Sequence, residues 1–363
     1  MPRVKASETF TALWQQQLSD YVTAIVWLPA DSPFPNHSLL AASAAGEITV
    51  FAAEGSQVHP IELQAPTDAS IDALALAHTG QFVAAGGQSG EVKIWRLQAQ
   101  PELIATLENA PAWVDRLVWH PAQNLLAFSL GRYVQVWDAD TNQVVATLHF
   151  ENSTVLDITW DPAGDRLAVS GYQGIKVWSI ADWDADPTWV EIPSASQLIA
   201  WSPDGKYIAS GNIDRTISVI EWENPGLPWV MQGFSGKIRQ VSWSDTALKQ
   251  GAPLLATSSS QSIVVWERHP DETIGWEGKV LGQHDDTVEA MQFQPGTSLL
   301  ATAGADGWVV LWQKLNRIGQ MLQGAPGGFS QLAWHPKAQQ FAAGGQRGEL
   351  IVWKQTSRGQ GFG

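Results

Sequence analysis

The sequence contains no cysteine in its 363 residues, which excludes disulfide bonds, thiolate metal ligands and a cysteine nucleophile. Basic residues are scarce, because 21 Lys and Arg stand against 36 Asp and Glu and give a formal net charge of −15. A field of this sign repels phosphate backbones, so we expect no direct binding of nucleic acid. No run of 18 apolar residues is present, and the N-terminal segment lacks the apolar core of a signal peptide. We therefore expect a soluble cytoplasmic protein without a membrane partner.

Motifs of catalysis are also missing from the sequence. It contains no G-x-S-x-G elbow, no G-x-x-x-x-G-K-[ST] phosphate loop, no H-E-x-x-H and no G-x-G-x-x-G. The acidic stretches at 138–142 and 182–186 lack the central Gly and distal Glu of a calcium loop. We expect no enzyme activity, no metal and no cofactor.

Tryptophan is abundant, with 20 residues, and most of them follow a repeat. The first mark of the repeat is a short apolar strand that ends in Trp and often in Pro. The second mark is an apolar strand that ends in Trp about 18 to 24 residues later. The first marks are IVWLP (25–29), LALAH (74–78), LVWHP (117–121), ITWDP (158–162), IAWSP (199–203), VSWSD (241–245), MQFQP (291–295) and LAWHP (332–336). The second marks are ITVF (48–51), VKIW (92–95), VQVW (134–137), IKVW (175–178), ISVI (217–220), IVVW (263–266), VVLW (309–312) and LIVW (350–353).

Each of the eight units contains room for four strands. A strand of small residues such as LLAAS or LLATAG lies between the two marks, and a further apolar strand follows the second mark. Four antiparallel strands in a period of about 43 residues is the size of one propeller blade. A single blade cannot bury both of its faces, whereas blades stacked around an axis can. The sequence therefore predicts an all-β fold, a single closed β-propeller.

The repeats resemble those of WD-repeat β-propellers, and HDDTVEAMQFQPGTSLLATAGADGWVVLW (284–312) is the unit most similar to that family. The resemblance implies a structural tetrad inside this blade. Its members are His284, Thr302, Asp306 and Trp312. In such a tetrad the carboxylate accepts a hydrogen bond from the imidazole and ties one turn to the next strand of the blade.

The eighth unit ends after its third strand, and TFTALWQQQ (9–17) is a spare strand ahead of the first unit. The resemblance implies that the N-terminal strand completes the last blade, which also removes an exposed sheet edge. We expect eight blades, with seven as the alternative because the first two units match poorly. Residues 1–356 then form the propeller, and 357–363 a disordered tail.

The resemblance also indicates a face for partners, around the channel mouth. This face carries the turns that lead into the first strands and the turns between second and third strands. Strand packing does not require the side chains in these turns, so charged and aromatic residues there are candidates for binding. The candidates are Tyr21, Trp113, Asp115, Arg132, Tyr133, Tyr172, Arg239, Glu289, Trp308 and Arg347. Trp113 and Trp308 stand out, because the blade pattern requires neither; the alternative is that each packs on a neighbouring turn.

Charge is distributed unevenly along the chain. Residues 6–92 contain nine acids and no Lys or Arg, whereas 307–363 contain six basic residues and one acid. One sector of the ring is therefore expected to be acidic and to attract a partner with a basic segment. The alternative is that the acids serve solubility only.

These observations favour a non-catalytic scaffold that recruits one or more protein partners, as a monomeric subunit of a complex. A second hypothesis is a propeller that binds a small molecule, a sugar or a peptide in its central channel, including a hydrolase. A third is a subunit of a nucleic-acid-modifying complex that contacts protein rather than RNA. The fold alone does not decide between them.

Overall fold

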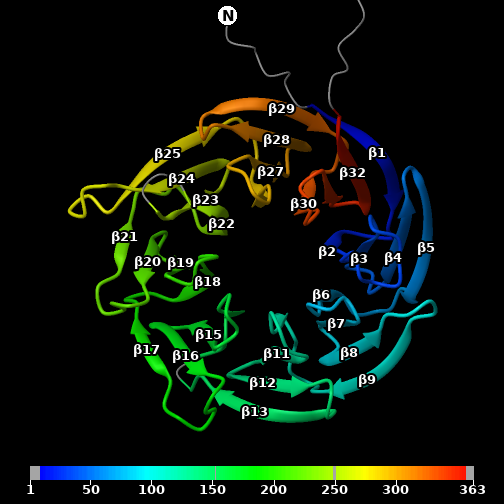
Figure 1. Ribbon diagram of the computed structural model, residues 1–363, viewed down its shortest axis with the longest axis horizontal. Helices are drawn as coiled ribbons and strands as arrows, with labels where there is room; N and C mark the ends of the chain where they lie inside the picture. The colour runs from blue at the N-terminus through cyan, green and yellow to red at the C-terminus, as the bar shows by residue number, and fades with distance from the viewer. Residues whose placement is uncertain (1–8, 152, 248–250, 357–363) are drawn as a thin grey trace, which may run out of the picture.

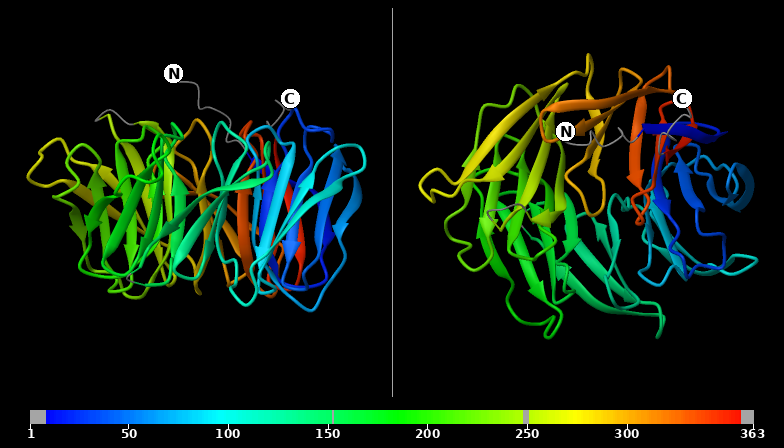
Figure 2. Two further views of the ribbon diagram at one scale, coloured as in Figure 1. Left: turned by 90° about the horizontal axis from the view of Figure 1, so that it is seen from below. Right: turned by 45° about the horizontal axis from the view of Figure 1, so that its top comes forward.

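The molecule is a ring of eight four-stranded antiparallel sheets around a central channel (Figure 1). The computed structural model describes residues 9–151, 153–247 and 251–356, and no helix occurs among them. Seen from the side, the strands run between two faces, and the turns project from both (Figure 2). The prediction of an eight-bladed propeller is confirmed, and the seven-bladed alternative is excluded. The predicted tail, 357–363, lies outside the described residues.

Each blade begins at the channel and ends at the outer rim, so its first strand is innermost and its fourth outermost. The first two blades are β2 (Val22–Trp27), β3 (Leu39–Ser43), β4 (Ile48–Glu54), β5 (Gln57–Gln64), and β6 (Ile71–Leu76), β7 (Phe82–Gly87), β8 (Glu91–Arg96), β9 (Glu102–Glu108). The third and fourth are β10 (Leu117–Trp119), β11 (Leu125–Leu130), β12 (Tyr133–Asp138), β13 (Gln143–His149), and β14 (Asp157–Trp160), β15 (Arg166–Gly171), β16 (Gly174–Ser179), β17 (Thr188–Glu191).

The second half of the ring repeats the same order. The fifth and sixth blades are β18 (Ser196–Trp201), β19 (Tyr207–Asn212), β20 (Ile217–Glu221), β21 (Trp229–Met231), and β22 (Ile238–Ala247), β23 (Pro253–Ser259), β24 (Ser262–Arg268), β25 (Trp276–Gly282). The seventh and eighth are β26 (Val288–Phe293), β27 (Leu300–Gly304), β28 (Trp308–Gln313), β29 (Arg317–Gln323), and β30 (Phe329–Trp334), β31 (Gln340–Gly345), β32 (Glu349–Thr356), with β1 (Thr9–Gln17) as the outermost strand of the eighth.

The two ends of the chain close the ring together. Strand β1 pairs antiparallel with β32, from Thr9 opposite Thr356 to Gln17 opposite Glu349. The Gln320 side chain of β29 both accepts from the Phe10 N–H and donates to the Phe10 carbonyl, each at 2.8 Å. The predicted closure by the N-terminal strand is confirmed, and β1 is tied to the seventh blade as well as to the eighth.

The core lies between neighbouring blades. The second strands are almost wholly buried, and their Ala and Gly residues allow adjacent sheets to approach closely. Large aromatics fill the remaining space: the Phe341 and Trp353 rings of the eighth blade stack at 5.0 Å and belong to one apolar cluster with Ala303 and Leu311 of the seventh. Burial between blades, rather than within one sheet, stabilises the ring.

The tryptophans of the first marks add a hydrogen bond across the blade boundary. Five of the six indole N–H groups donate to a carbonyl on the innermost strand of the preceding blade. The pairs are Trp27 with Ala333 (2.9 Å), Trp119 with Ala75 (3.2 Å), Trp160 with Val118 (3.3 Å), Trp243 with Ala200 (3.0 Å) and Trp334 with Gln292 (3.0 Å). The sixth, Trp201, is buried with no hydrogen-bond partner for its Nε1 among the described residues. The repeated Trp thus fixes neighbouring blades to each other, in addition to filling space.

Candidate protein-interaction site

The channel-mouth face, which carries the turns into the first strands and those between second and third strands, is shaped by a repeated β-bulge. In six of the eight blades one residue near the start of the innermost strand has no partner in the ladder. These residues are Thr23, Asp72, Gln197, Arg239, Glu289 and Ser330. A bulge of this kind redirects one side chain out of the regular alternation. All six of these residues are polar, and three of them, Asp72, Arg239 and Glu289, carry a charge.

The predicted residues Tyr21, Arg239 and Glu289 lie close together on this face. The Arg239 Nη1 is 3.9 Å from the Glu289 carboxylate, and the Arg239 side chain is half exposed. Burial, and after it the charge of Glu289, raises the pKa of the Tyr21 phenol. These three residues come from blades six, seven and one, so the sequence alone did not place them together.

A second charged group joins three consecutive blades. The Arg116 Nε is 3.1 Å from the Asp157 Oδ1, and the other carboxylate oxygen accepts from the Ile199 N–H at 2.9 Å. Burial raises the pKa of the Asp157 carboxyl, and the Arg116 guanidinium opposes that rise. The predicted Asp115 lies exposed beside this pair, and its carbonyl accepts from the Arg116 Nη1 at 2.9 Å.

The sequence analysis missed Arg116 and Lys237, which line a cavity of about 330 Å³ together with Gln197 and Arg239. Both missed residues stand within two positions of a predicted one, Asp115 or Arg239. The sequence contained a signal for Arg116, because this residue directly precedes a first mark. The ion pair that orients its side chain, however, is formed with Asp157 of the next blade.

The two tryptophans outside the blade pattern differ in exposure. Trp113, in the turn before β10, is 56% exposed, and Tyr172, between β15 and β16, is 51% exposed. Trp308 instead packs against the apolar cluster that includes Leu281 and Val310. Trp113 and Tyr172 are therefore the free aromatic surfaces of this face, and Trp308 serves packing.

The remaining candidates are spread around the same face. Arg132 and Arg347 are exposed, and Arg347 uses its backbone N–H to donate to the Glu349 carboxylate at 3.1 Å. Tyr133 is partly buried beside the His149 ring, with 5.9 Å between ring centroids.

The four residues of the tetrad are in contact in the seventh blade. The His284 Nδ1 is 2.9 Å from the Asp306 carboxylate, and its Nε2 is 2.9 Å from the Thr302 hydroxyl. The Trp312 indole donates to the same hydroxyl at 3.0 Å. Asp306 also accepts from the backbone N–H of Asp285 at 3.0 Å, so the carboxylate fixes the turn that precedes β26.

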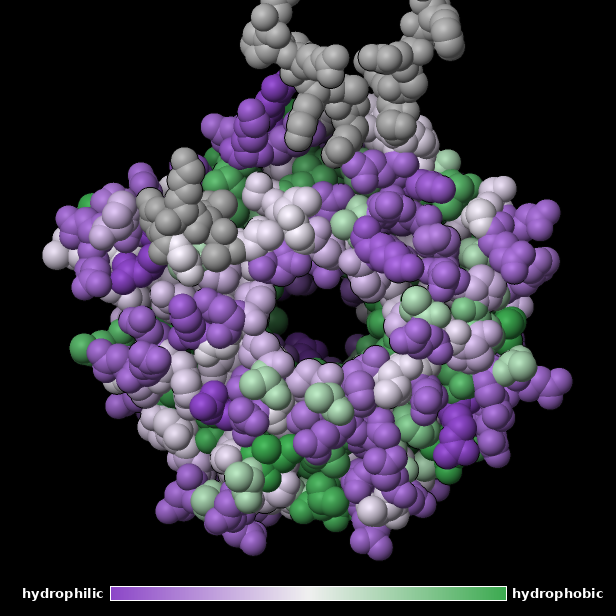
Figure 3. All heavy atoms as spheres, in the orientation of Figure 1, coloured by the Kyte–Doolittle hydropathy of each residue, from purple (hydrophilic) through white to green (hydrophobic). Residues whose placement is uncertain are grey.

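The opposite face, seen in Figure 3, carries the turns between first and second strands, and the channel is open at its centre.

Within the described residues no group of His, Asp or Glu has the arrangement of a metal site. No helix among these residues is long and apolar enough to cross a membrane.

Comparison with known proteins agrees with this architecture. Four segments match the WD40 family (WD domain, G-beta repeat): 58–96, 142–179, 198–221 and 275–313. Three of the matched segments begin in or at the outermost strand of one blade and end at the third strand of the next, while 198–221 covers three strands of the fifth blade. The matches therefore follow the repeat that the tryptophans mark.

Among similar proteins is a Protein SEC13 homolog from Drosophila melanogaster, 24% identical over 287 residues that cover 69% of this chain and 78% of that protein. The Nuclear distribution protein nudF 1 of Talaromyces marneffei is 32% identical over 114 residues, 31% of this chain and 24% of that protein. Protein HIR1 of Yarrowia lipolytica is 28% identical over 133 residues, 33% of this chain and 12% of that protein. The chain thus matches less than a quarter of the length of the last two. Four matched segments within a closed ring of eight four-stranded blades identify the chain as a β-propeller that contains WD40 repeats.

Proposed function

We propose that the protein is a non-catalytic scaffold that recruits protein partners through its channel-mouth face, as a monomeric subunit of a cytoplasmic complex. The observation that carries this proposal is the exposure of Trp113 and Tyr172 at 56% and 51% on the same face. Exposed aromatics beside Arg are the side chains that contribute most to protein interfaces. Rigid strands hold the turns that present them, which keeps the entropy cost of binding low.

Charge indicates the kind of partner. Five carboxylates lie in the mouth-facing turns of the first three blades or at the start of the strand that follows: Asp20, Glu47, Asp68, Asp72 and Asp115. Burial raises the pKa of Asp72, and the Ser70 hydroxyl donates to its carboxylate at 2.7 Å. This acidic arc favours a partner with a basic segment, which it would attract over several ångströms.

The alternative of a ligand in the channel has one observation in its favour. The cavity beside Arg116, Lys237 and Arg239 is about 330 Å³ in volume, at the lower end of the range for small-molecule pockets. Three cationic side chains in its lining favour an anionic ligand there. Absence of a stoichiometric protein partner would favour this alternative over the scaffold.

The decisive experiment is co-purification of tagged protein from its native cells, with the wild type beside Trp113→Ala. Truncation of an exposed aromatic anchor removes about 2 kcal/mol or more of binding free energy, so we expect the partner to be lost or reduced more than about tenfold. The matched control is Val280→Ala, which truncates a side chain that is 72% exposed on the outer rim. A partner retained by Trp113→Ala and lost from Val280→Ala would move the site from the channel mouth to the outer strands.

A further inference from the structure

The second blade carries the remains of a tetrad. With the blades aligned on their first marks, Thr67 stands where the seventh blade has His284, and Ser89 stands where it has Asp306. The strand register places Ala85 at the position of Thr302, because Ala85 pairs with Leu74 as Thr302 pairs with Met291. All three replacements are smaller than the residues of the intact tetrad.

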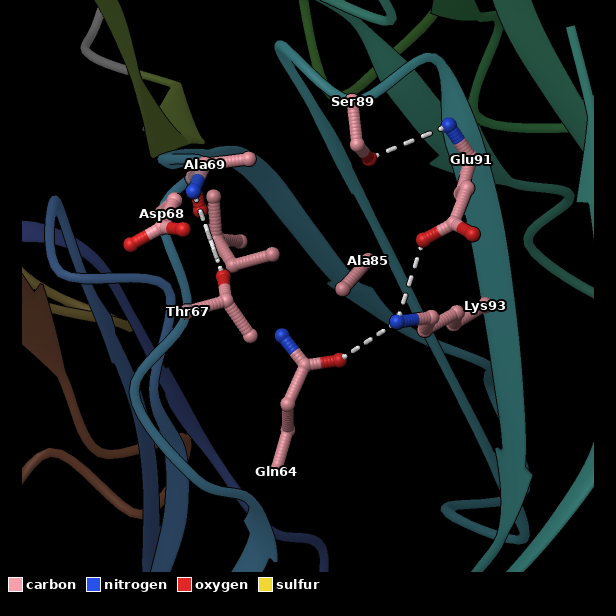
Figure 4. A pocket seen from close by; sticks show the side chains of 9 residues that line it. Gln64, Thr67, Asp68, Ala69, Ala85, Ser89, Glu91 and Lys93 are labelled. Carbon is pink, nitrogen blue, oxygen red and sulfur yellow. Dashed lines mark hydrogen bonds and ion pairs between the residues drawn. The ribbon is translucent and has the colours of Figure 1, made fainter.

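These three positions, Thr67, Ala85 and Ser89, line a cavity of about 170 Å³ (Figure 4). Thr67 and Ala69 stand on one side of it, and Ala85 and Ser89 on the other. The cavity opens to solvent, because Thr67, Asp68 and Ser89 in its lining are exposed. A ligand can therefore reach it, and the chemistry of its walls decides which ligand fits.

Two residues of the cavity wall are polar where the corresponding residues of the sixth and seventh blades are apolar. Gln64 occupies the register position of Leu281, and Lys93 that of Val310, both of which are buried core residues. The Lys93 ammonium is held at 3.1 Å from the Gln64 Oε1 and at 3.1 Å from the Glu91 carboxylate. Polar side chains held in place in this way suit a polar ligand.

The fourth blade shows that a lysine at this position does not by itself require a cavity. Lys176 has the register position of Lys93, and its ammonium is 3.2 Å from the His149 carbonyl. The rings of Phe150 and Trp178 lie 5.7 Å and 5.9 Å from that ammonium and fill the space. In the second blade Pro66 stands at the sequence position of Phe150, and no aromatic ring lines the cavity.

The charge and the size of the cavity indicate which ligand fits it. The cavity has two carboxylates in its lining, Asp68 and Glu91, against one ammonium, Lys93, and it lies in the acidic arc. Its volume of about 170 Å³ is below the range of drug-sized ligands but accommodates a single side chain. The carboxylates and the Thr67 and Ser89 hydroxyls supply several acceptors in the lining of the cavity, and a guanidinium has five donors in a fixed plane.

We propose that this cavity receives an arginine side chain from the basic segment of a protein partner. The inference rests on the proposed function, because it names the chemistry by which that partner is recognised. Glu91 and Asp68 pair with the guanidinium, and Thr67 and Ser89 accept its remaining N–H groups. The arginine of the partner then fills the space left by the tetrad side chains that the second blade lacks.

The test uses isolated protein and N-acetyl-L-arginine amide as the probe, followed by backbone amide NMR. We expect saturable shifts at the amides of Thr67, Ser89 and Glu91, and none with N-acetyl-L-citrulline amide, which has the same shape without the charge. The triple variant Thr67→His, Ala85→Thr, Ser89→Asp restores the tetrad pattern and fills the cavity. Its affinity for the probe should fall by more than about tenfold.

A second variant, Glu91→Gln, removes a carboxylate without filling the cavity and covers the case in which the triple variant does not fold. It should also lower the affinity for the probe by more than about tenfold. Equal shifts with the citrulline probe, no saturable shift at these amides, or undiminished binding in both variants would each overturn the proposal. The two experiments test the two proposals separately. The NMR assay contains no protein partner, so a negative result there does not contradict recruitment through Trp113. Conversely, a negative co-purification result does not contradict binding of the probe in the cavity.

Discussion

Two tryptophans at the same position of neighbouring blades differ in one hydrogen bond. The Trp243 indole donates to the Ala200 carbonyl at 3.0 Å, whereas the buried Trp201 indole N–H has no partner among the described residues. Replacement by Phe removes a similar ring in both cases but a hydrogen bond in only one. We expect Trp243→Phe to lower the free energy of unfolding by about 1 kcal/mol more than Trp201→Phe. Urea unfolding of both variants measures the difference, and equal losses would mean that these indoles act through packing alone.

The limits of sequence reasoning are clearest at single residues. Trp113 and Trp308 share the property of standing outside the blade pattern, and nothing local separates them. The structure leaves Trp113 56% exposed but packs Trp308 on residues contributed by the sixth and seventh blades. Which of the two is free depends on the neighbouring sheet, which a pattern along one chain segment does not specify.

Whole strands were easier to predict than their first residues. The Trp and Pro marks lie inside or just after strands and recur at nearly constant spacing, so each blade could be divided into strands from the sequence. The bulges at Asp72, Arg239 and Glu289 add one residue without disturbing any apolar mark, and they left no periodic signal. The outermost strand of the fifth blade, β21, is only three residues long.

The Asp157 carboxylate connects three innermost strands, and we expect its ionisation to change the free energy of unfolding with pH. Asp157 begins β14, pairs with Arg116 ahead of β10 and accepts from Ile199 of β18. Burial raises its pKa, so the folded protein binds this proton more tightly than the unfolded chain does. The resulting stabilisation is fully present below about pH 4 and is lost as pH rises through the raised pKa.

The comparison that tests this effect is Asp157→Asn, which keeps an acceptor for the Ile199 N–H but does not titrate. We expect the unfolding free energy of the wild type, relative to Asp157→Asn, to decrease as pH rises from about 4 to 7. Asp115→Asn, at an exposed carboxylate nearby, controls for the change in net charge. A difference that is constant with pH, or that increases, would contradict the expected direction.

At the scale of the whole molecule, the ring depends on a strand from the opposite end of the chain. Deletion of residues 1–17 removes β1 and leaves β32 as an exposed edge in the eighth blade. The deletion also removes the apolar contacts of Phe10 and Trp14, which are 3% and 6% exposed. We expect the melting temperature to fall by more than about 5 °C, because two buried aromatics contribute several kcal/mol.

A peptide with the sequence TFTALWQQQ distinguishes the loss of this strand from general damage. Added in excess to the truncated protein, it should raise the melting temperature with concentration, since it binds only the folded ring, and a scrambled peptide should not. An unchanged melting curve after deletion would contradict closure by β1. The ring would then be held by the direct contacts of the first and eighth blades, where the Ser330 hydroxyl donates to the Val22 carbonyl at 2.7 Å and the Trp27 indole to that of Ala333.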